Sequence, residues 1–158
     1  MTITQQIAKQ VRDFYSGGNW TGVNLKDSLE GISWQQSITK VHSSNTIEAL
    51  VFHMNYYVNA LTKVLEGTPL EAHDKFSFDR PPIVSEEDWE KLKTKTWREA
   101  EQFAMLIEQL PEQKLNENLP GNKYGTWLRN IEGAIEHCHY HLGQIVLIKK
   151  ILLTENEK

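Results

Sequence analysis

Apolar residues recur every three to four positions in four long segments of the chain, which is the spacing of one buried face on an α-helix. These segments span about residues 3–16, 45–66, 85–110 and 126–153. Two shorter stretches of the same kind, near 24–30 and 33–41, lie between the first two long segments. The pattern therefore predicts an all-α protein built on four long helices.

Residues that start and stop helices bracket these segments. Asn45 with Glu48 resembles a capping box at the start of the second helix, with Asn in place of the usual Ser or Thr. Gly67 followed by Pro69 is a stop signal at its end. We expect Gly17-Gly18-Asn19 to end the first helix, because these residues tolerate a positive φ.

The connection between the second and third helices, residues 67–84, predicts how these helices run. It is 18 residues long, whereas helix connections in bundles usually have about 2–8. An extended chain of this length reaches roughly 60 Å, which suffices to cross a bundle from end to end. We therefore expect the two helices to be parallel within a four-helix bundle, with residues 1–158 as one domain.

Two tryptophans lie in the segment before the second long helix. Trp20 and Trp34 are expected to pack over one end of the core, and a lid over a substrate is the alternative. In the fourth helix Cys138 falls inside the apolar stripe and is expected to be a small buried residue, with a metal-binding thiolate as the alternative.

Histidines are the most informative chemical feature of the fourth helix. His137, His139 and His141 fall within five residues. His137 and His141 are four apart and share one helix face, as do the two zinc-binding histidines of an H-E-x-x-H motif. His139 lies about 200° round the helix from His137 and cannot join them. Alone, such a pair is a weak motif.

A further histidine, His53, lies in the middle of the apolar face of the second helix. A buried imidazole needs a hydrogen bond or a metal ion, and the sequence leaves both open. If the second and fourth helices face each other, His53, His137 and His141 supply three imidazoles with an open fourth position. That is the ligand set of a catalytic zinc site. Zn²⁺ is the simplest choice, and Ni²⁺, Fe²⁺ or Co²⁺ also accept imidazoles.

Two residues near this predicted site are candidates for supporting roles. Tyr57 follows His53 by one turn and is a candidate for orienting a ligand, with core packing as the alternative. Gln144 lies near His137 on the helical wheel and is a candidate for a hydrogen bond to a metal ligand, with a surface amide as the alternative.

Composition and charge exclude several classes of function. The net charge is −4 and no basic stripe is visible, which argues against a nucleic-acid backbone as the main partner. No apolar run reaches the roughly 18 residues of a membrane span, and the first residues do not resemble a signal peptide. With a single cysteine, no intramolecular disulfide forms. We expect a cytoplasmic protein.

The motif His137-x-x-x-His141, followed directly by Leu-Gly-Gln-Ile, together with His53 in a second helix, resembles the DinB-like superfamily, also called the DinB/YfiT metal-dependent hydrolases. The similarity covers nearly the whole chain in helix order and in the long second connection. The resemblance implies a four-helix bundle of up-down-down-up topology. It also implies a divalent metal ion held by His53, His137 and His141.

This resemblance also bears on function. It implies a metal-dependent enzyme acting on a small molecule, either a thiol-dependent S-transferase with a low-molecular-weight thiol as partner or a hydrolase. No Asp or Glu falls on the inner helix faces, so no general base is assigned. The alternative is a non-catalytic metal-binding or stress-associated protein, and an open cleft at the metal would distinguish the two. A homodimer through a helix face is also expected.

Overall fold

The computed structural model describes residues 1–121 and 123–155, which confirm the all-α prediction. The long helices are α1 (Ile3–Ser16), α4 (Ile47–Leu65), α5 (Glu86–Gln109) and α6 (Trp127–Glu155), and the short ones are α2 (Leu25–Leu29) and α3 (Trp34–Ser37). Two 3₁₀ turns, η1 (Asp74–Phe76) and η2 (Glu112–Asn116), lie in the connections. Among the described residues, β pairing is limited to one bridge between Asn118 and Thr126.

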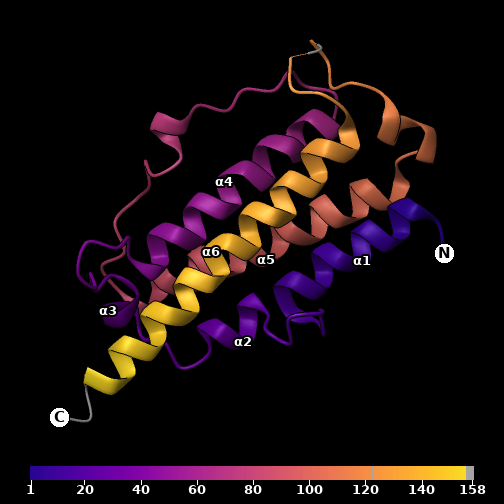
Figure 1. Ribbon diagram of the computed structural model, residues 1–158. Helices are drawn as coiled ribbons and strands as arrows, with labels where there is room; N and C mark the ends of the chain where they lie inside the picture. The colour runs from indigo at the N-terminus through magenta and orange to yellow at the C-terminus, as the bar shows by residue number, and fades with distance from the viewer. Residues whose placement is uncertain (122, 156–158) are drawn as a thin grey trace.

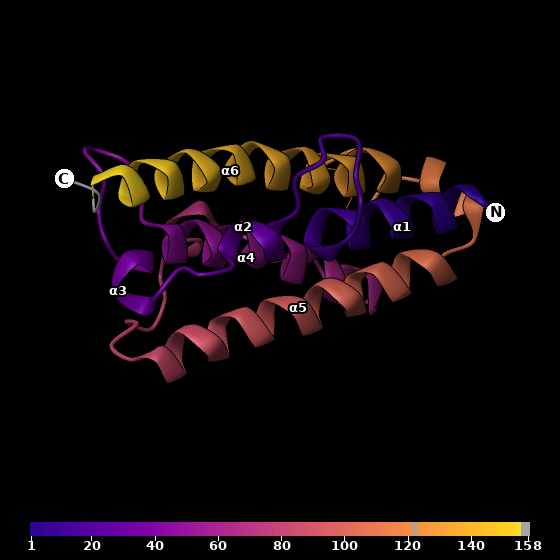
Figure 2. The same cartoon turned by 90° about the horizontal axis from the view of Figure 1, so that it is seen from below.

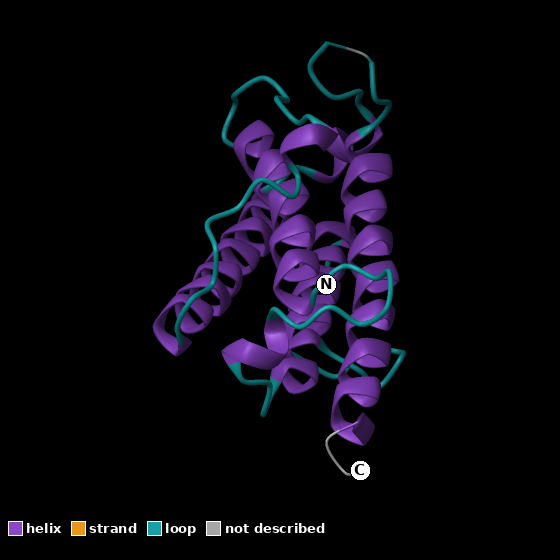
Figure 3. Ribbon diagram, turned by 90° about the vertical axis from the view of Figure 1, so that its left-hand side faces the viewer, coloured by secondary structure: helices purple, strands orange, loops and turns teal. Residues whose placement is uncertain are grey.

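The four long helices lie side by side, with their axes roughly along one direction (Figure 1). α1 packs against α5, α5 against α4, and α4 against α6. Figures 1 and 2 show α4 and α5 running the same way, with α1 and α6 running opposite to them. The connection between α4 and α5 therefore returns along the outside of the helices (Figure 3), as its length predicts.

Side-chain caps set the starts of the long helices. The Ser85 hydroxyl accepts a hydrogen bond from the backbone N–H of Asp88, which places the start of α5 where the sequence predicts it. α4 differs from the prediction because its cap is Thr46 and not Asn45. The Thr46 hydroxyl accepts from the backbone N–H of Ala49, so the helix begins at the next residue.

Two expectations for the segment after α1 are wrong. The helix does end at Gly17, but in extended backbone with φ of −111°, and none of residues 17–19 has a positive φ. Trp20 is fully exposed, whereas Trp34 does pack against the core. The side chain of Asn19 donates hydrogen bonds to the carbonyl oxygens of Asp13 and Val23. These bonds hold the loop against its own backbone and leave Trp20 without an apolar surface to cover.

The core is one continuous apolar cluster, and α4 lies at its centre, buried on more than one face. Four polar side chains on α4 are buried with it: Glu48, His53, Asn55 and Thr62. Buried polar groups need partners. Asn55 donates to the carboxylate of Glu99 on α5, and the Thr62 hydroxyl donates back to a carbonyl of its own helix.

Every helix in the described part of the chain is too short or too polar to cross a membrane.

Glu48 on α4 anchors the long connection between α4 and α5. Its carboxylate receives two hydrogen bonds from the guanidinium of Arg80, which lies near the end of the connection. Arg80 also donates to the backbone carbonyl of Phe78, at 3.1 Å. The Glu48 side chain is only 5% exposed and that of Arg80 is 27% exposed. Because this ion pair is largely out of water, it holds residues 78–80 in a fixed position beside α4.

The first prediction concerns this ion pair. Replacing Arg80 with Met leaves the Glu48 carboxylate buried without its cation. We expect the free energy of unfolding in urea to fall by about 2–3 kcal/mol, less than for a fully buried pair because Arg80 is partly exposed. The double variant Arg80→Met/Glu48→Gln should recover part of the loss, since no charge is then left unpaired.

Arg98→Met is the matched control, because the Arg98 side chain is 72% exposed. Its free energy of unfolding should stay within about 0.5 kcal/mol of the parent. If Arg80→Met is no more destabilised than this control, the ion pair does not hold the connection.

Candidate metal centre

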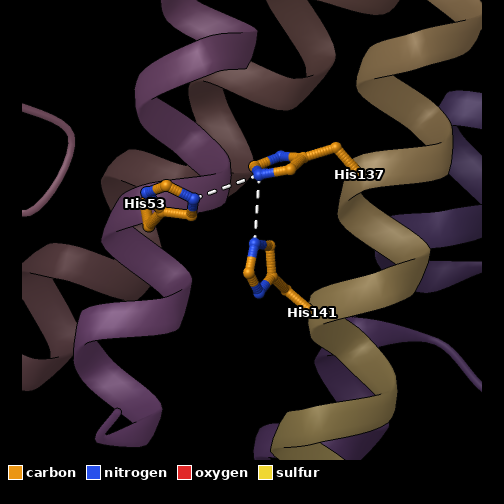
Figure 4. A group of neighbouring side chains, drawn as sticks. All are labelled: His53, His137 and His141. Atoms are coloured by element: carbon orange, nitrogen blue, oxygen red, sulfur yellow. Dashed lines mark hydrogen bonds between the residues drawn. The ribbon is translucent and has the colours of Figure 1, made fainter. Parts of the chain in front are cut away.

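Three histidines from two helices meet between α4 and α6. His53 lies on α4, and His137 and His141 lie on successive turns of α6 (Figure 4). The Nε2 atom of His137 is 3.1 Å from Nε2 of His53 and 3.0 Å from Nε2 of His141. One ring nitrogen from each residue lies within 4.8 Å of the other two. The three residues selected from the sequence are therefore neighbours in space and are able to hold a metal ion.

The chemistry of the ring nitrogens fits a shared metal ion. Each Nε2 carries either one lone pair or one hydrogen, so His137 cannot make well-directed hydrogen bonds to both neighbours through the same atom. In a tetrahedral zinc site with Zn–N distances of 2.0–2.1 Å, ligand nitrogens lie about 3.3 Å apart. The two separations from His137 are close to that value. A single cation among the three rings would engage every lone pair.

Burial favours the neutral form of two of these imidazoles, His137 and His53. His53 and His141 are 8% and 7% exposed, and His137 is half-buried. The pKa of His137 is lowered to about 4, first by burial and then by His141 and His53. Burial also lowers the pKa of His53, followed by the nearby His141, against smaller opposing effects from the Ser77 backbone and Asp74. Neutral imidazole is the form that binds a metal ion.

A side-chain hydrogen bond orients one of the three rings. His141 Nδ1 donates to Oε1 of Gln144, at 2.7 Å. This bond leaves the lone pair of His141 on Nε2, the atom that faces His137. The sequence placed Gln144 near His137, but the structure pairs it with His141, because residues three apart on a helix also share a face.

Two other residues of this stretch point away from the cluster. His139 Nδ1 donates to the carbonyl oxygen of Ile135, and its ring contacts Phe14 with centroids 4.9 Å apart. Cys138 is buried, as predicted, and burial raises the pKa of its thiol to about 12. Neither belongs to the group of neighbouring metal-binding side chains found among the described residues.

The long connection supplies residues that sequence analysis missed. The Phe78 ring stacks on His53 with centroids 4.1 Å apart and an 8° angle between the planes. The Tyr57 ring meets the rings of His53 and His137 edge to face, and its hydroxyl donates to Asp74 at 2.5 Å. Asp74 therefore brings a carboxylate close to the histidines. The prediction that no Asp or Glu lies on the inner helix faces is wrong, because Glu48 and Glu99 are buried there, but their carboxylates bind Arg80 and Asn55. The connection lacks helical periodicity, so only its length hinted that it crosses the site.

A cavity of about 860 Å³ opens beside His137 and Tyr57. Its walls come from α4, the long connection and the start of α6, and include Leu61, Leu70, Asp74 and Arg129. Ligand pockets of proteins usually measure about 300–1,000 Å³. The cluster of histidines thus borders, through His137, a space large enough for a small organic molecule.

No family model, curated protein or solved structure matches this chain. Membership of the DinB-like superfamily therefore stays a prediction, which rests on the motif around His137 and His141 and on His53.

The second prediction concerns the hydrogen bond between Gln144 and His141. In metal-free protein, ¹H–¹⁵N correlation spectra of the imidazoles should show His141 with its proton on Nδ1. The variant Gln144→Ala removes the acceptor, so this tautomer should lose its preference. Gln144→Glu is the matched variant, because its carboxylate still accepts the bond. If His141 carries its proton on Nε2 in the parent protein, the proposed orientation of the ring is wrong.

Proposed function

We propose that this chain is a divalent-metal-dependent enzyme in which His53, His137 and His141 hold the metal ion. One observation carries the proposal: the imidazoles of two buried histidines and one half-buried histidine converge, and the half-buried one, His137, lines a cavity of about 860 Å³. Three imidazole ligands leave a coordination position open, as in catalytic zinc sites, whereas structural zinc sites are closed by four protein ligands. Zn²⁺ is our first choice, with Ni²⁺ or Fe²⁺ as alternatives.

The fold supports the same proposal. We interpret the opposite directions of α1 and α6 relative to α4 and α5 as a four-helix bundle of up-down-down-up topology (Figure 1). This is the arrangement that the resemblance to the DinB-like superfamily implies. In such bundles metal sites are commonly built from inward side chains on facing helices, as they are here on α4 and α6.

A divalent metal ion would lower the pKa of a water or thiol bound to it, and so supply a nucleophile near neutral pH. The surrounding residues have complementary roles. Gln144 orients His141, and Phe78 covers one face of His53 against water. Tyr57 lies beside His137 on the cavity wall, with its hydroxyl held by Asp74. The Tyr57 hydroxyl is therefore positioned to contact a ligand in the cavity.

Two reactions suit this arrangement. Transfer of a low-molecular-weight thiol to an electrophilic small molecule is the one favoured by the resemblance. Hydrolysis is the second candidate, and it is supported by the carboxylate of Asp74, which lies one hydrogen bond beyond Tyr57 and is able to accept a proton. The cavity beside His137 argues against a purely structural or storage role, because such a role needs no open space at the metal.

The third prediction is the metal content of the purified, untagged chain. We expect about one transition-metal ion per chain by elemental analysis, and its loss in His53→Ala, His137→Ala and His141→Ala, because two imidazoles bind a divalent ion far less tightly than three. Metal-loaded parent protein should also melt at a higher temperature than metal-free protein, since the ion binds only the folded state.

His139→Gln is the matched control for this series, because His139 lies on the same helix between two proposed ligands but points toward Phe14. It should retain the metal. Circular dichroism of all four variants checks that they remain helical. A parent protein that takes up no metal after incubation with Zn²⁺, Ni²⁺ or Fe²⁺ would refute the proposed function.

The fourth prediction separates the two reactions. When Co²⁺ replaces the native ion, adding a small thiol such as 2-mercaptoethanol should produce a thiolate-to-cobalt charge-transfer band if the open position takes a thiol. The band should be absent in His137→Ala. A cobalt spectrum that does not respond to thiols, in protein shown to hold cobalt, would favour hydrolysis.

A further inference from the structure

We infer that the substrate of the proposed enzyme is a small organic anion whose charged group binds Arg129, which lines the same cavity as His137. This inference rests on the proposed function for the identity of the reacting end. The binding of the anion itself follows from residues outside the histidine cluster.

Two positively charged side chains line the cavity, Arg129 from α6 and Lys75 from the long connection. Arg129 also lies in the first turn of α6, where the helix dipole adds partial positive charge.

The donors of Arg129 are available to a ligand. Among the described residues, the closest carboxylate to its guanidinium is that of Glu136, at 3.8 Å, and both side chains are about 70% exposed. An exposed pair at that distance contributes little. Lys75 has no carboxylate within 4.0 Å in the described part of the chain and lies over the ring of Phe76. A carboxylate or phosphate would meet a planar fork of N–H donors on Arg129.

A glycine leaves room for this guanidinium. A Cβ atom added to Gly133 would be 2.8 Å from Nη1 of Arg129, so the arginine occupies the space that any side chain at this position would take. Gly133 precedes His137 by four residues, a rise of about 6 Å along the helix. The absence of a side chain at position 133 thus lets Arg129 reach back toward the histidines along the cavity wall.

Part of the remaining cavity wall is apolar. Ala60 and Leu61 of α4, Leu70 of the connection and Ala134 of α6 line it. Asp74 is the acidic residue in this lining, and it already accepts a hydrogen bond from Tyr57. The cavity therefore suits a molecule with an anionic group at one end, a short apolar body, and its reacting group about one to two helical turns away, near His137.

The fifth prediction tests binding apart from catalysis. Isothermal titration calorimetry of the full chain, freed of metal with a chelator, compares hexanoate, hexyl phosphate and the neutral hexanamide. We expect the anions to bind more tightly than the amide, and the better of the two anions distinguishes a carboxylate from a phosphate site. Arg129→Gln should weaken anion binding about tenfold or more by removing the bidentate contact, with little effect on the amide.

Gly133→Ala gives a sharper test of the geometry. Alanine favours the helix, so the variant should be at least as stable as the parent, yet its Cβ atom displaces Arg129 and should weaken hexanoate binding severalfold. Lys150→Gln removes a charge from the other end of α6 and should change nothing.

The outcomes separate this inference from the proposed function. Equal binding of hexanoate and hexanamide, no binding of any probe, or an Arg129→Gln variant that binds hexanoate like the parent would each overturn the anion site, even in a protein that holds metal. If the chain takes up no metal but its hexanoate binding depends on Arg129 and Gly133, the anion site stands and the metal enzyme does not.

Discussion

The cost of burying three imidazole rings between α4 and α6 is the constraint on which the rest of the site depends. Each ring leaves water for an interface that is otherwise largely apolar, and a buried polar group without a partner is destabilising. The rings meet through Nε2 atoms, and one of those atoms faces two others. The apolar core around α4 and α6 supplies the stability that makes this arrangement tolerable, and a bound cation would give each lone pair its partner.

The packing of α4 against α6 explains why the rings meet at all. His53 is separated from His137 by 84 positions in the chain, so no local structure brings them together. The apolar faces of the two helices must be buried against each other, and each histidine lies within or beside such a face. The same burial that orders the core therefore also fixes the geometry of the site and lowers the pKa of His137 and His53.

The direction of α5 determines the other wall of the site. Because α4 and α5 run the same way, the chain must return along the outside of α4 before α5 starts (Figure 3). That return places Phe78 on His53 and Asp74 on Tyr57, and the ion pair between Arg80 and Glu48 anchors it. A hairpin between α4 and α5 would leave His53 without this cover. The topology of the helices thus provides both the cavity and the polar groups that line it.

The periodicity of apolar residues predicted the bounds of α1 closely. It failed at positions whose structure depends on hydrogen bonds from side chains in the loops. Thr46 and not Asn45 caps α4, since both residue types can cap and the pattern does not distinguish adjacent candidates. Trp20 is exposed because the hydrogen bonds of the Asn19 side chain hold the loop against its own backbone. The pattern of apolar residues does not predict these hydrogen bonds. Gln144 was placed beside His137 on the helical wheel, but the structure pairs its side chain with His141.

The sequence by itself determined the helices, the buried stripe of α6 that includes Cys138, and the choice of His53, His137 and His141, because helical periodicity states which side chains share a buried face. Only the tertiary structure decided that these faces meet, that Asp74 and Phe78 return to the site, and that Arg129 lies over Gly133 in the cavity. Residues in a connection carry no periodic signal, and their position depends on the elements that the connection must cross.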